Sequence, residues 1–276
     1  MRRVRQRLSV LLALAIPVLA GLAYLSFAGA PSRYLAINGG ALVLGLAAAL
    51  LVSKPASAGA RRSLAIAMLA ALFLPLLIGP SIAGVARWLP LGPFALHSAG
   101  LLLPPLLALA LTDEKFAAPI LVGALCAGLL QPDAAIGIVI AFASAASYRV
   151  TGDKRVGLVS LLALFATVIM AMRGNPPPEE FVERVLVDAT ASSAVAGAGL
   201  VMALATSLFL ILRAIPAPKA IRHALAASLL AFTVLSLLGD YPSVLIGYGA
   251  APILGFGIAL ALGCVRPPAS PSPRGD

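Results

Sequence analysis

The chain has 276 residues, of which 61% are hydrophobic and 11% are charged, and its formal net charge is +10. A soluble globular domain is about half apolar and about a quarter charged. This composition therefore argues against a soluble enzyme, a disordered chain and a disulfide scaffold, and it is typical of a protein embedded in lipid. The basic residues form small clusters between apolar runs rather than one stripe, which argues against a nucleic-acid partner.

The N-terminal apolar run follows four arginines and begins at Leu8. Ala28-Gly29-Ala30 resembles the cleavage site of a signal peptide. However, the run from Leu8 to Phe27 is longer than the apolar core of a typical signal, and Pro31 directly follows the would-be cleavage point. We therefore interpret this run as a retained first membrane span.

A helix needs about 20 apolar residues to cross a bilayer, because its backbone must satisfy its own hydrogen bonds there. Breaking the chain at its polar and Pro/Gly-rich points gives ten candidate spans. They cover residues 8–28, 34–52, 63–79, 97–112, 116–131, 134–148, 156–172, 189–212, 222–239 and 250–265. The spans 116–131 and 134–148 are either two tilted helices or a re-entrant pair.

We therefore predict an all-α fold, a polytopic membrane helical bundle with about ten transmembrane helices. Residues 1–266 form a single transmembrane domain in this prediction. Residues 267–276 are rich in Pro and Ser and are expected to form a disordered cytoplasmic tail.

The distribution of charge predicts the orientation. With the N-terminus inside, sixteen of the 20 basic residues lie in inner segments and only four lie in outer ones. Basic residues concentrate on the cytoplasmic side of membrane proteins, so both termini are predicted to be cytoplasmic. The outer segments instead hold six of the 10 acidic residues, namely Asp133, Glu179, Glu180, Glu183, Asp188 and Asp240.

Several polar groups in the outer segments are candidate binding residues. Arg87-Trp88 is either an interfacial anchor with a snorkelling arginine or a cation placed to meet a phosphate or carboxylate. Gln131-Pro132-Asp133 breaks two apolar helices and is either a solvated turn or a functional site. Tyr248 borders the last outer loop.

Two further patterns concern metals and helix packing. His97 and His223 fall on opposite sides of the membrane in this topology, so no metal site is expected. Small residues recur every fourth position on the last span, which predicts that another helix approaches it closely. These residues are Ala251, Gly255, Ala259 and Gly263, with a weaker instance at Ser193 and Gly197.

Three outer motifs, in this order and topology, resemble the SEDS family of shape, elongation, division and sporulation proteins, which includes the FtsW, RodA and SpoVE groups. The family's R-W-I-x-L-G compares with the segment 87–92, its Q-P-D-L-G-T with 131–136, and its L-P-x-x-x-x-S-Y-G-G-S with 241–251. The resemblance covers roughly residues 80–265.

The resemblance implies a multi-pass protein of the bacterial inner membrane, with ten spans and both termini cytoplasmic. Family members polymerise a lipid-linked peptidoglycan precursor at the outer face and commonly work beside a single-pass penicillin-binding protein. Their glycosyl transfer uses an outer carboxylate as general base. We expect this chain to have no cofactor. By this resemblance Arg87, Trp88, Gln131, Asp133 and Tyr248 are expected to bind substrate.

The chain also departs from the family pattern. The family's Q-P-S-E-x-x-K is replaced by residues 97–103, which lose the acid and the lysine. The large outer loop that carries H-T-D-F is shortened to about 173–188, and the motif is missing. Asp188, with Glu183 one turn away, is a substitute catalytic carboxylate by position only.

Three functions follow as alternatives. The first is a SEDS-like envelope protein of peptidoglycan synthesis, cell division or cell shape that binds a lipid-linked precursor or a partner without normal polymerase activity. The second is a compact active peptidoglycan glycosyltransferase. The third is a transporter or flippase for a small molecule or lipid, since broken helices and an acid at membrane depth also suit that class.

Overall fold

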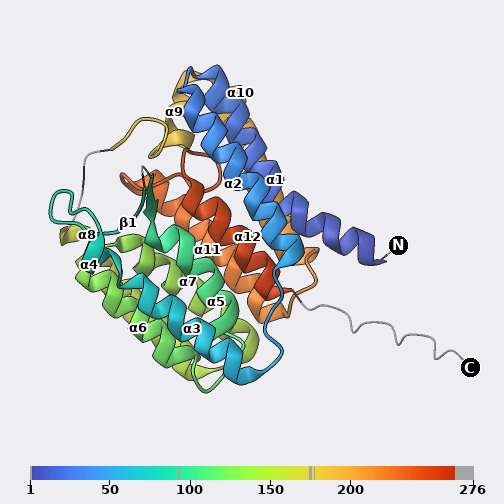
Figure 1. The fold of residues 1–276 in the computed structure, drawn as a ribbon, viewed down its shortest axis with the longest axis vertical. Helices are drawn as coiled ribbons and strands as arrows, with labels where there is room; N and C mark the ends of the chain where they lie inside the picture. The colour runs from blue at the N-terminus through green and yellow to red at the C-terminus, as the bar shows by residue number, and fades with distance from the viewer. Residues whose placement is uncertain (1, 93, 174–175, 177, 265–276) are drawn as a thin grey trace, which may run out of the picture.

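The computed structural model describes residues 2–92, 94–173, 176 and 178–264, and it forms a bundle of helices (Figure 1). By length and composition, seven helical segments among these described residues are able to cross a membrane. They are α1 (Arg2–Phe27), α2 (Ser32–Leu51), α3 (Ala58–Leu72) with α4 (Pro75–Ile78), α7 (Ala134–Thr151), α8 (Lys154–Arg173), α10 (Ala194–Arg213) and α11 (Lys219–Leu238).

Three shorter apolar helices complete the bundle, namely α5 (Ser98–Ala110), α6 (Ala117–Leu130) and α12 (Ala250–Gly263). Each of the ten spans expected from the sequence coincides with one of these segments, so the all-α polytopic fold is confirmed. The expected tail, 267–276, lies outside the described residues.

One span boundary was predicted wrongly. The sequence suggested one helix over 189–212, but the structure has a separate short helix, α9 (Val185–Ser192), before α10. Ser193 separates them in an extended conformation, and its hydroxyl accepts a hydrogen bond from the Ala196 N–H and thereby caps α10. A Cβ on Gly197 would collide with Thr190, so the glycine lets α9 fold back closely onto α10.

The small-residue stripe of the last span has the expected role. Helix α12 packs between α2 and α5. A Cβ on Gly255 would collide with the backbone carbonyl of Gly100 on α5, and one on Gly257 would collide with the backbone of Gly45 on α2. The glycines therefore bring three helix backbones together at the centre of the bundle.

Burial explains why α5 and α12 are short. At 1.5 Å per residue, their 13 and 14 residues span only about 20 Å, less than the roughly 30 Å hydrocarbon core of a bilayer. All but two residues of α5 and most of α12 are buried. Because protein surrounds these helices, they have no need to match the thickness of the lipid.

A small β-hairpin in the segment before α5 was not expected from the sequence. Strands β1 (Trp88–Leu91) and β2 (Phe94–His97) pair antiparallel, with Trp88 opposite His97 and Leu91 opposite Phe94. Gly92, in the turn, has a φ of 60°, a conformation that glycine adopts readily. The pairing brings the two ends of this segment together above the bundle.

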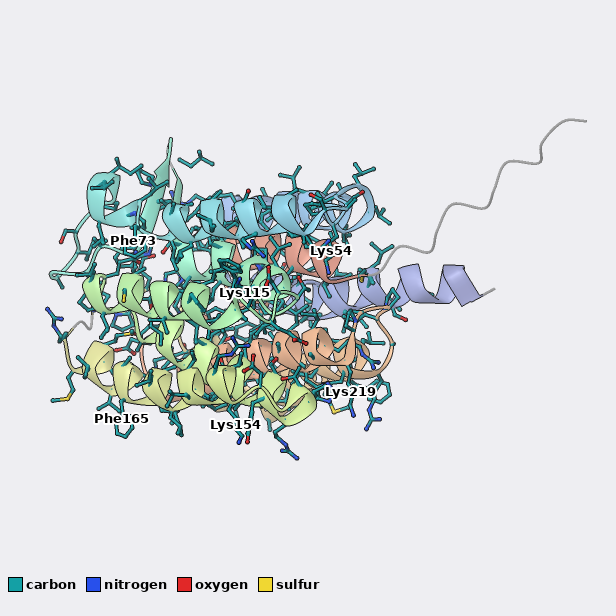
Figure 2. All side chains as sticks on the ribbon, turned by 90° about the horizontal axis from the view of Figure 1, so that it is seen from below. Lys54, Phe73, Lys115, Lys154, Phe165 and Lys219 are labelled. Atoms are coloured by element: carbon teal, nitrogen blue, oxygen red, sulfur yellow. The ribbon has the colours of Figure 1, made fainter. Side chains whose placement is uncertain are left out.

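The helices alternate in direction, so the connections gather at two opposite ends. One is named here the hairpin end and holds segments 28–31, 79–97, 131–133, 178–184 and 239–249, with α4 and α9 (Figure 1). The other is named the basic end and holds segments 52–57, 111–116, 152–153 and 214–218. In Figure 2, Lys54, Lys115, Lys154 and Lys219 lie toward the end of the bundle from which the pale blue helix α1 projects. Phe73 and Phe165 lie toward the opposite end.

Candidate functional site

The β-hairpin brings two basic side chains of the hairpin end together. Arg87 directly precedes β1 and His97 ends β2, and the Ser98 N–H donates a hydrogen bond of 2.9 Å to the Arg87 carbonyl. His97 also caps α5, because its Nδ1 accepts a hydrogen bond from the Gly100 N–H. The strand register thus places the guanidinium and the imidazole over the bundle.

Asp133 lies between these two groups. It caps α7, since its Oδ1 accepts from the Ala135 N–H. Arg87 Nη1 is 3.8 Å from Asp133 Oδ1, and His97 Nε2 is 3.2 Å from Asp133 Oδ2. Asp133 is completely buried and Arg87 is 2% exposed. The three side chains therefore form a buried polar cluster inside the protein.

Tyr241 and Gln131 complete this cluster. The Tyr241 hydroxyl accepts a hydrogen bond from the Ala134 N–H at 3.1 Å, and the Arg87 guanidinium lies 4.9 Å from the Tyr241 ring centre. The amide of Gln131 donates to the Leu72 carbonyl, and its Oε1 is 3.4 Å from the Ser98 hydroxyl. The buried polar cluster thus connects α3, α5, α7 and the segment 239–249.

The snorkelling interpretation of Arg87 and the solvated-turn interpretation of Gln131-Pro132-Asp133 are wrong, whereas an interfacial position of Trp88 stays a prediction. Arg87 does not snorkel, because its side chain is enclosed by protein, and Gln131-Pro132-Asp133 is not a solvated turn. Trp88 is only half-buried, and the Arg87 guanidinium lies 5.2 Å from its ring centre. No sequence pattern indicated this role for His97, whereas Tyr241 is the first residue of the segment compared with a family motif.

Glu183 approaches the same cluster from the segment 178–184. It forms an isolated β-bridge with Pro242, and its Oε2 accepts a hydrogen bond of 2.6 Å from the Glu179 N–H. Burial raises the pKa of Glu183 from 4.5 to about 7, although the Glu179 N–H and the charge of Arg87 lower it. The raised pKa favours the protonated carboxyl more than in an exposed glutamate.

An open pocket lies beside the segment 178–184, which contributes Glu180 and Phe181 to its lining. It has a volume of about 550 Å³ and lies between the end of α1, α9 and the start of α10. Its lining combines carboxylates, hydroxyls and aromatic rings. The residues are Tyr24, Phe27, Ala28, Glu180, Phe181, Val185, Asp188, Ser192, Ser193 and Ala196.

Asp188 and Glu183 therefore face different surroundings. Asp188 is exposed and lines the open pocket, whereas Glu183 is half-buried and is not among the lining residues. The sequence had grouped these two carboxylates by position, but only Asp188 lines the open pocket. Tyr24 and Ser192, which the sequence analysis did not single out, accompany Asp188 in the pocket.

Tyr248 belongs to neither group. Its ring stacks on Tyr34 with centres 3.7 Å apart, and its N–H donates to the Phe181 carbonyl at 2.7 Å. Asn38 holds the neighbouring residues, donating to the Gly247 carbonyl and accepting from the Gly249 N–H. These contacts fasten the segment 239–249 to the start of α2.

The hairpin end offers carboxylates, hydroxyls and basic side chains, which serve proton transfer, charge pairing and hydrogen bonding. In the described ranges, no three His, Cys, Asp or Glu side chains are grouped in a way that suits a metal ion. Asp188 and Glu180 in the open pocket and Glu183 beside the cluster are carboxylates suited to acid-base chemistry.

The fold is that of SEDS-type polytopic membrane proteins. The structure is similar to that of the rod shape determining protein RodA of Thermus thermophilus, with a TM-score of 0.64 and 22% sequence identity over 92% of this chain and 93% of that one. For an aspartate-to-alanine mutant of that RodA, the TM-score is 0.68, with 22% identity over 92% and 94% of the two chains.

A third similar structure comes from work on the structural coordination of polymerization and crosslinking by a peptidoglycan synthase complex. Its TM-score is 0.64, with 22% identity over 92% of this chain and 96% of that chain. No model of a known family matches this sequence, and no curated protein does. The resemblance predicted from the three motifs is thus confirmed at the level of the fold.

Proposed function

We propose that this protein is a SEDS-like component of the bacterial inner membrane, linked to peptidoglycan synthesis, cell division or cell shape. In this proposal it binds a lipid-linked glycan precursor in the open pocket at the hairpin end and does not polymerise it. The RodA-like fold supports the class of protein, and the chemistry of the pocket supports the ligand.

The lining of the open pocket suits a lipid-linked sugar. Carboxylates and hydroxyls are hydrogen-bonding partners for sugar hydroxyls, and aromatic rings pack against the faces of sugar rings; the pocket offers Asp188, Ser192 and Phe181. Phe27, at the end of α1, lines the pocket and is 93% exposed, and an exposed apolar ring on a membrane helix suits contact with lipid. A ligand anchored in the membrane is thus able to reach the pocket from the bilayer.

The position of the basic side chains is the single observation that supports a lack of polymerase activity. None of the described residues that line the pocket is Lys, Arg or His. Arg87, which the family resemblance assigned to the substrate, is buried beside Asp133. Glycosyl transfer from a lipid pyrophosphate leaves two phosphates that need positive charge, and this pocket does not supply it.

The proposal extends to a partner. Penicillin-binding proteins with one membrane span are the expected partners, and one of the similar structures comes from a peptidoglycan synthase complex. The N-terminus is placed in the cytoplasm in this proposal, with the hairpin end outside, because the basic end carries the clusters of Lys and Arg.

The test uses the full chain purified in detergent, with a fluorescent lipid-linked disaccharide pyrophosphate as the probe. We expect saturable binding but no glycan strands on a gel. Asp188→Asn should weaken binding several-fold, because it removes an acceptor charge from the pocket. Asp240→Asn is the matched control, since Asp240 is on the same end of the bundle but does not line the pocket.

Two results would overturn the proposal. One is the absence of saturable binding by a folded wild-type chain. The other is polymerisation that Asp188→Asn abolishes and Asp240→Asn leaves intact, which would establish the active glycosyltransferase instead.

That active enzyme is the second candidate, and the exposure of Asp188 in an open pocket favours it. In it, Asp188 takes the proton of an acceptor hydroxyl. The hydroxyl oxygen then bonds to the anomeric carbon of the donor sugar as the bond from that carbon to the lipid pyrophosphate breaks. The transporter alternative gains no such support, because Asp133 is buried and paired with Arg87 and His97.

A further inference from the structure

A groove at the basic end, far from the open pocket, has the composition of a lipid site. It lies between α7 and α8 and has a volume of about 460 Å³. Ala145 and Tyr148 line it from α7, and Lys154, Gly157 and Leu161 are among the lining residues from α8. The groove is named here the α7–α8 groove.

The walls of the α7–α8 groove are apolar and open to the bilayer. Leu158 and Leu161 line it and are 58% and 56% exposed. The hydroxyl of Ser160 donates to the Ala141 carbonyl at 2.9 Å, so it offers no free polar group to the groove. Gly157 lets the Tyr148 ring pack closely on α8, since a Cβ there would lie 3.1 Å from that ring. An acyl chain fits such a wall.

Positive charge gathers at one end of the groove. Lys154 lines it, and Arg149 lies in the last turn of α7. The nearby carboxylate of Asp153 forms an ion pair with Arg155, whose Nε lies 3.3 Å from Asp153 Oδ1. Within the described residues, Arg149 and Lys154 therefore have no carboxylate partner.

A hydrogen-bond donor accompanies this charge. Tyr148 is 42% exposed and lines the groove, and no described side chain or carbonyl pairs with its hydroxyl. A phosphate at the mouth of the groove is able to accept from this hydroxyl and from the Lys154 ammonium. Basic pockets between membrane helices are recurrent binding sites for the head groups of anionic lipids.

We propose that the α7–α8 groove binds one anionic phospholipid. One acyl chain lies along the apolar wall formed by Leu158 and Leu161, and the phosphate lies between Lys154 and the Tyr148 hydroxyl, with Arg149 adding long-range attraction. Charge complementarity selects the occupant, because a zwitterionic lipid carries its own cation and gains less from Lys154. This site is independent of the precursor pocket proposed above.

Native mass spectrometry of the full chain in detergent tests the site. The probes are phosphatidylglycerol and phosphatidylethanolamine with identical acyl chains, supplied at equal concentration. We expect preferential retention of one phosphatidylglycerol. A basic residue near the membrane surface contributes about fivefold to the binding of anionic lipid, so Lys154→Gln should lower this retention about fivefold.

Matched variants separate the site from general charge. Lys219→Gln removes the same charge at the same end of the bundle but away from the groove, and it should retain phosphatidylglycerol as the wild type does. Ala145→Phe fills the groove and should lower the retention of both lipids, with thermal unfolding confirming that the variant is folded. Free glycerol phosphate should not displace the lipid.

Three outcomes would overturn the proposal. They are equal retention of the two lipids by the wild type, equal losses in Lys154→Gln and Lys219→Gln, and displacement of the lipid by glycerol phosphate alone. The last would indicate a site for a soluble phosphate instead of a lipid.

Discussion

The hairpin end contains two acidic sites that differ in almost every physical respect. The buried polar cluster holds Asp133 between Arg87 and His97, inside the protein and at the junction of several helices. The open pocket holds Asp188 on the short helix α9, where it is exposed and has hydroxyl and aromatic neighbours. The segment 178–184 lies between them, with Glu183 toward the cluster and Glu180 in the pocket.

The difference separates structural from binding roles. A charge buried with its partner mainly fixes how the connecting segments meet, because either charge alone would be costly inside the protein. An exposed carboxylate in a cavity remains free to meet a ligand. The residues most like the family motifs are therefore the ones that hold the hairpin end together, and a residue chosen by position alone faces the cavity.

The largest expected effect comes from breaking the buried cluster. Asp133→Ala leaves Arg87 buried without its counter-charge and should lower the free energy of unfolding by about 3–5 kcal/mol. Denaturant unfolding of the chain in detergent measures this loss. Asp188→Ala should change stability little, because that side chain is exposed. Equal losses in the two variants would remove the distinction between the sites.

The next largest effect concerns the close contact between α9 and α10 beside the open pocket. In Gly197→Ala the new methyl group collides with Thr190, which should push α9 away from α10 and lower stability by about 1–3 kcal/mol. Binding of the lipid-linked probe should weaken as the pocket changes shape.

Gly199→Ala is the matched control, since a Cβ there meets nothing within 4 Å. It should leave binding unchanged, and helix propensity favours the alanine by up to about 1 kcal/mol. If Gly197→Ala were as stable as Gly199→Ala, the close approach of α9 and α10 would not matter.

A smaller, pH-dependent effect should arise at Glu183, in the segment 178–184. Burial raises the folded-state pKa of Glu183 to about 7. The packing of the segment 178–184 is therefore most stable below about pH 4.5, and it loses stability as the pH rises through 7. Hydrogen exchange of the segment 178–184, divided by the intrinsic rate at each pH, should increase several-fold over this range.

Glu183→Gln should abolish this pH dependence, since the amide does not titrate. Glu180→Gln should preserve it, because Glu180 is exposed on the pocket side. A pH response that persisted in Glu183→Gln would assign the proton to another group.

The smallest effect concerns the Tyr34–Tyr248 stack, which lies outside both sites. A double-mutant cycle with Tyr34→Ala and Tyr248→Ala should give a coupling free energy of about 0.5–1.5 kcal/mol, as expected for a stacked aromatic pair. Neither variant should change binding of the lipid-linked probe. Loss of binding in Tyr248→Ala alone would return Tyr248 to the substrate-binding residues.

Much of the fold was predictable from local patterns. The ten apolar segments appear as helices near their predicted limits. They were recognisable because a stretch of consecutive apolar residues is visible directly in the sequence. The stripe through Gly255 predicted a close helix neighbour, since the absence of a side chain is visible in the sequence. The motifs around Arg87, Asp133 and Tyr248 indicated the RodA-like fold.

The surroundings of the candidate residues were not predictable in the same way. Burial of Arg87 depends on a hairpin register and on Asp133, which is 46 residues away along the chain. The break at Ser193 depends on a hydroxyl cap within an otherwise continuous apolar run. Both outcomes follow from contacts between distant segments, which local periodicity does not encode.

By itself, then, the sequence determined the polytopic helical class of the protein, the positions of its apolar helical segments and the segregation of charge between the two ends, because hydropathy and charge act residue by residue. Only the tertiary structure decided that Arg87 and Asp133 neutralise each other inside the protein while Asp188 opens to a cavity. The reason is physical, since the role of a charge depends on which groups enclose it, and folding brings those groups from several helices.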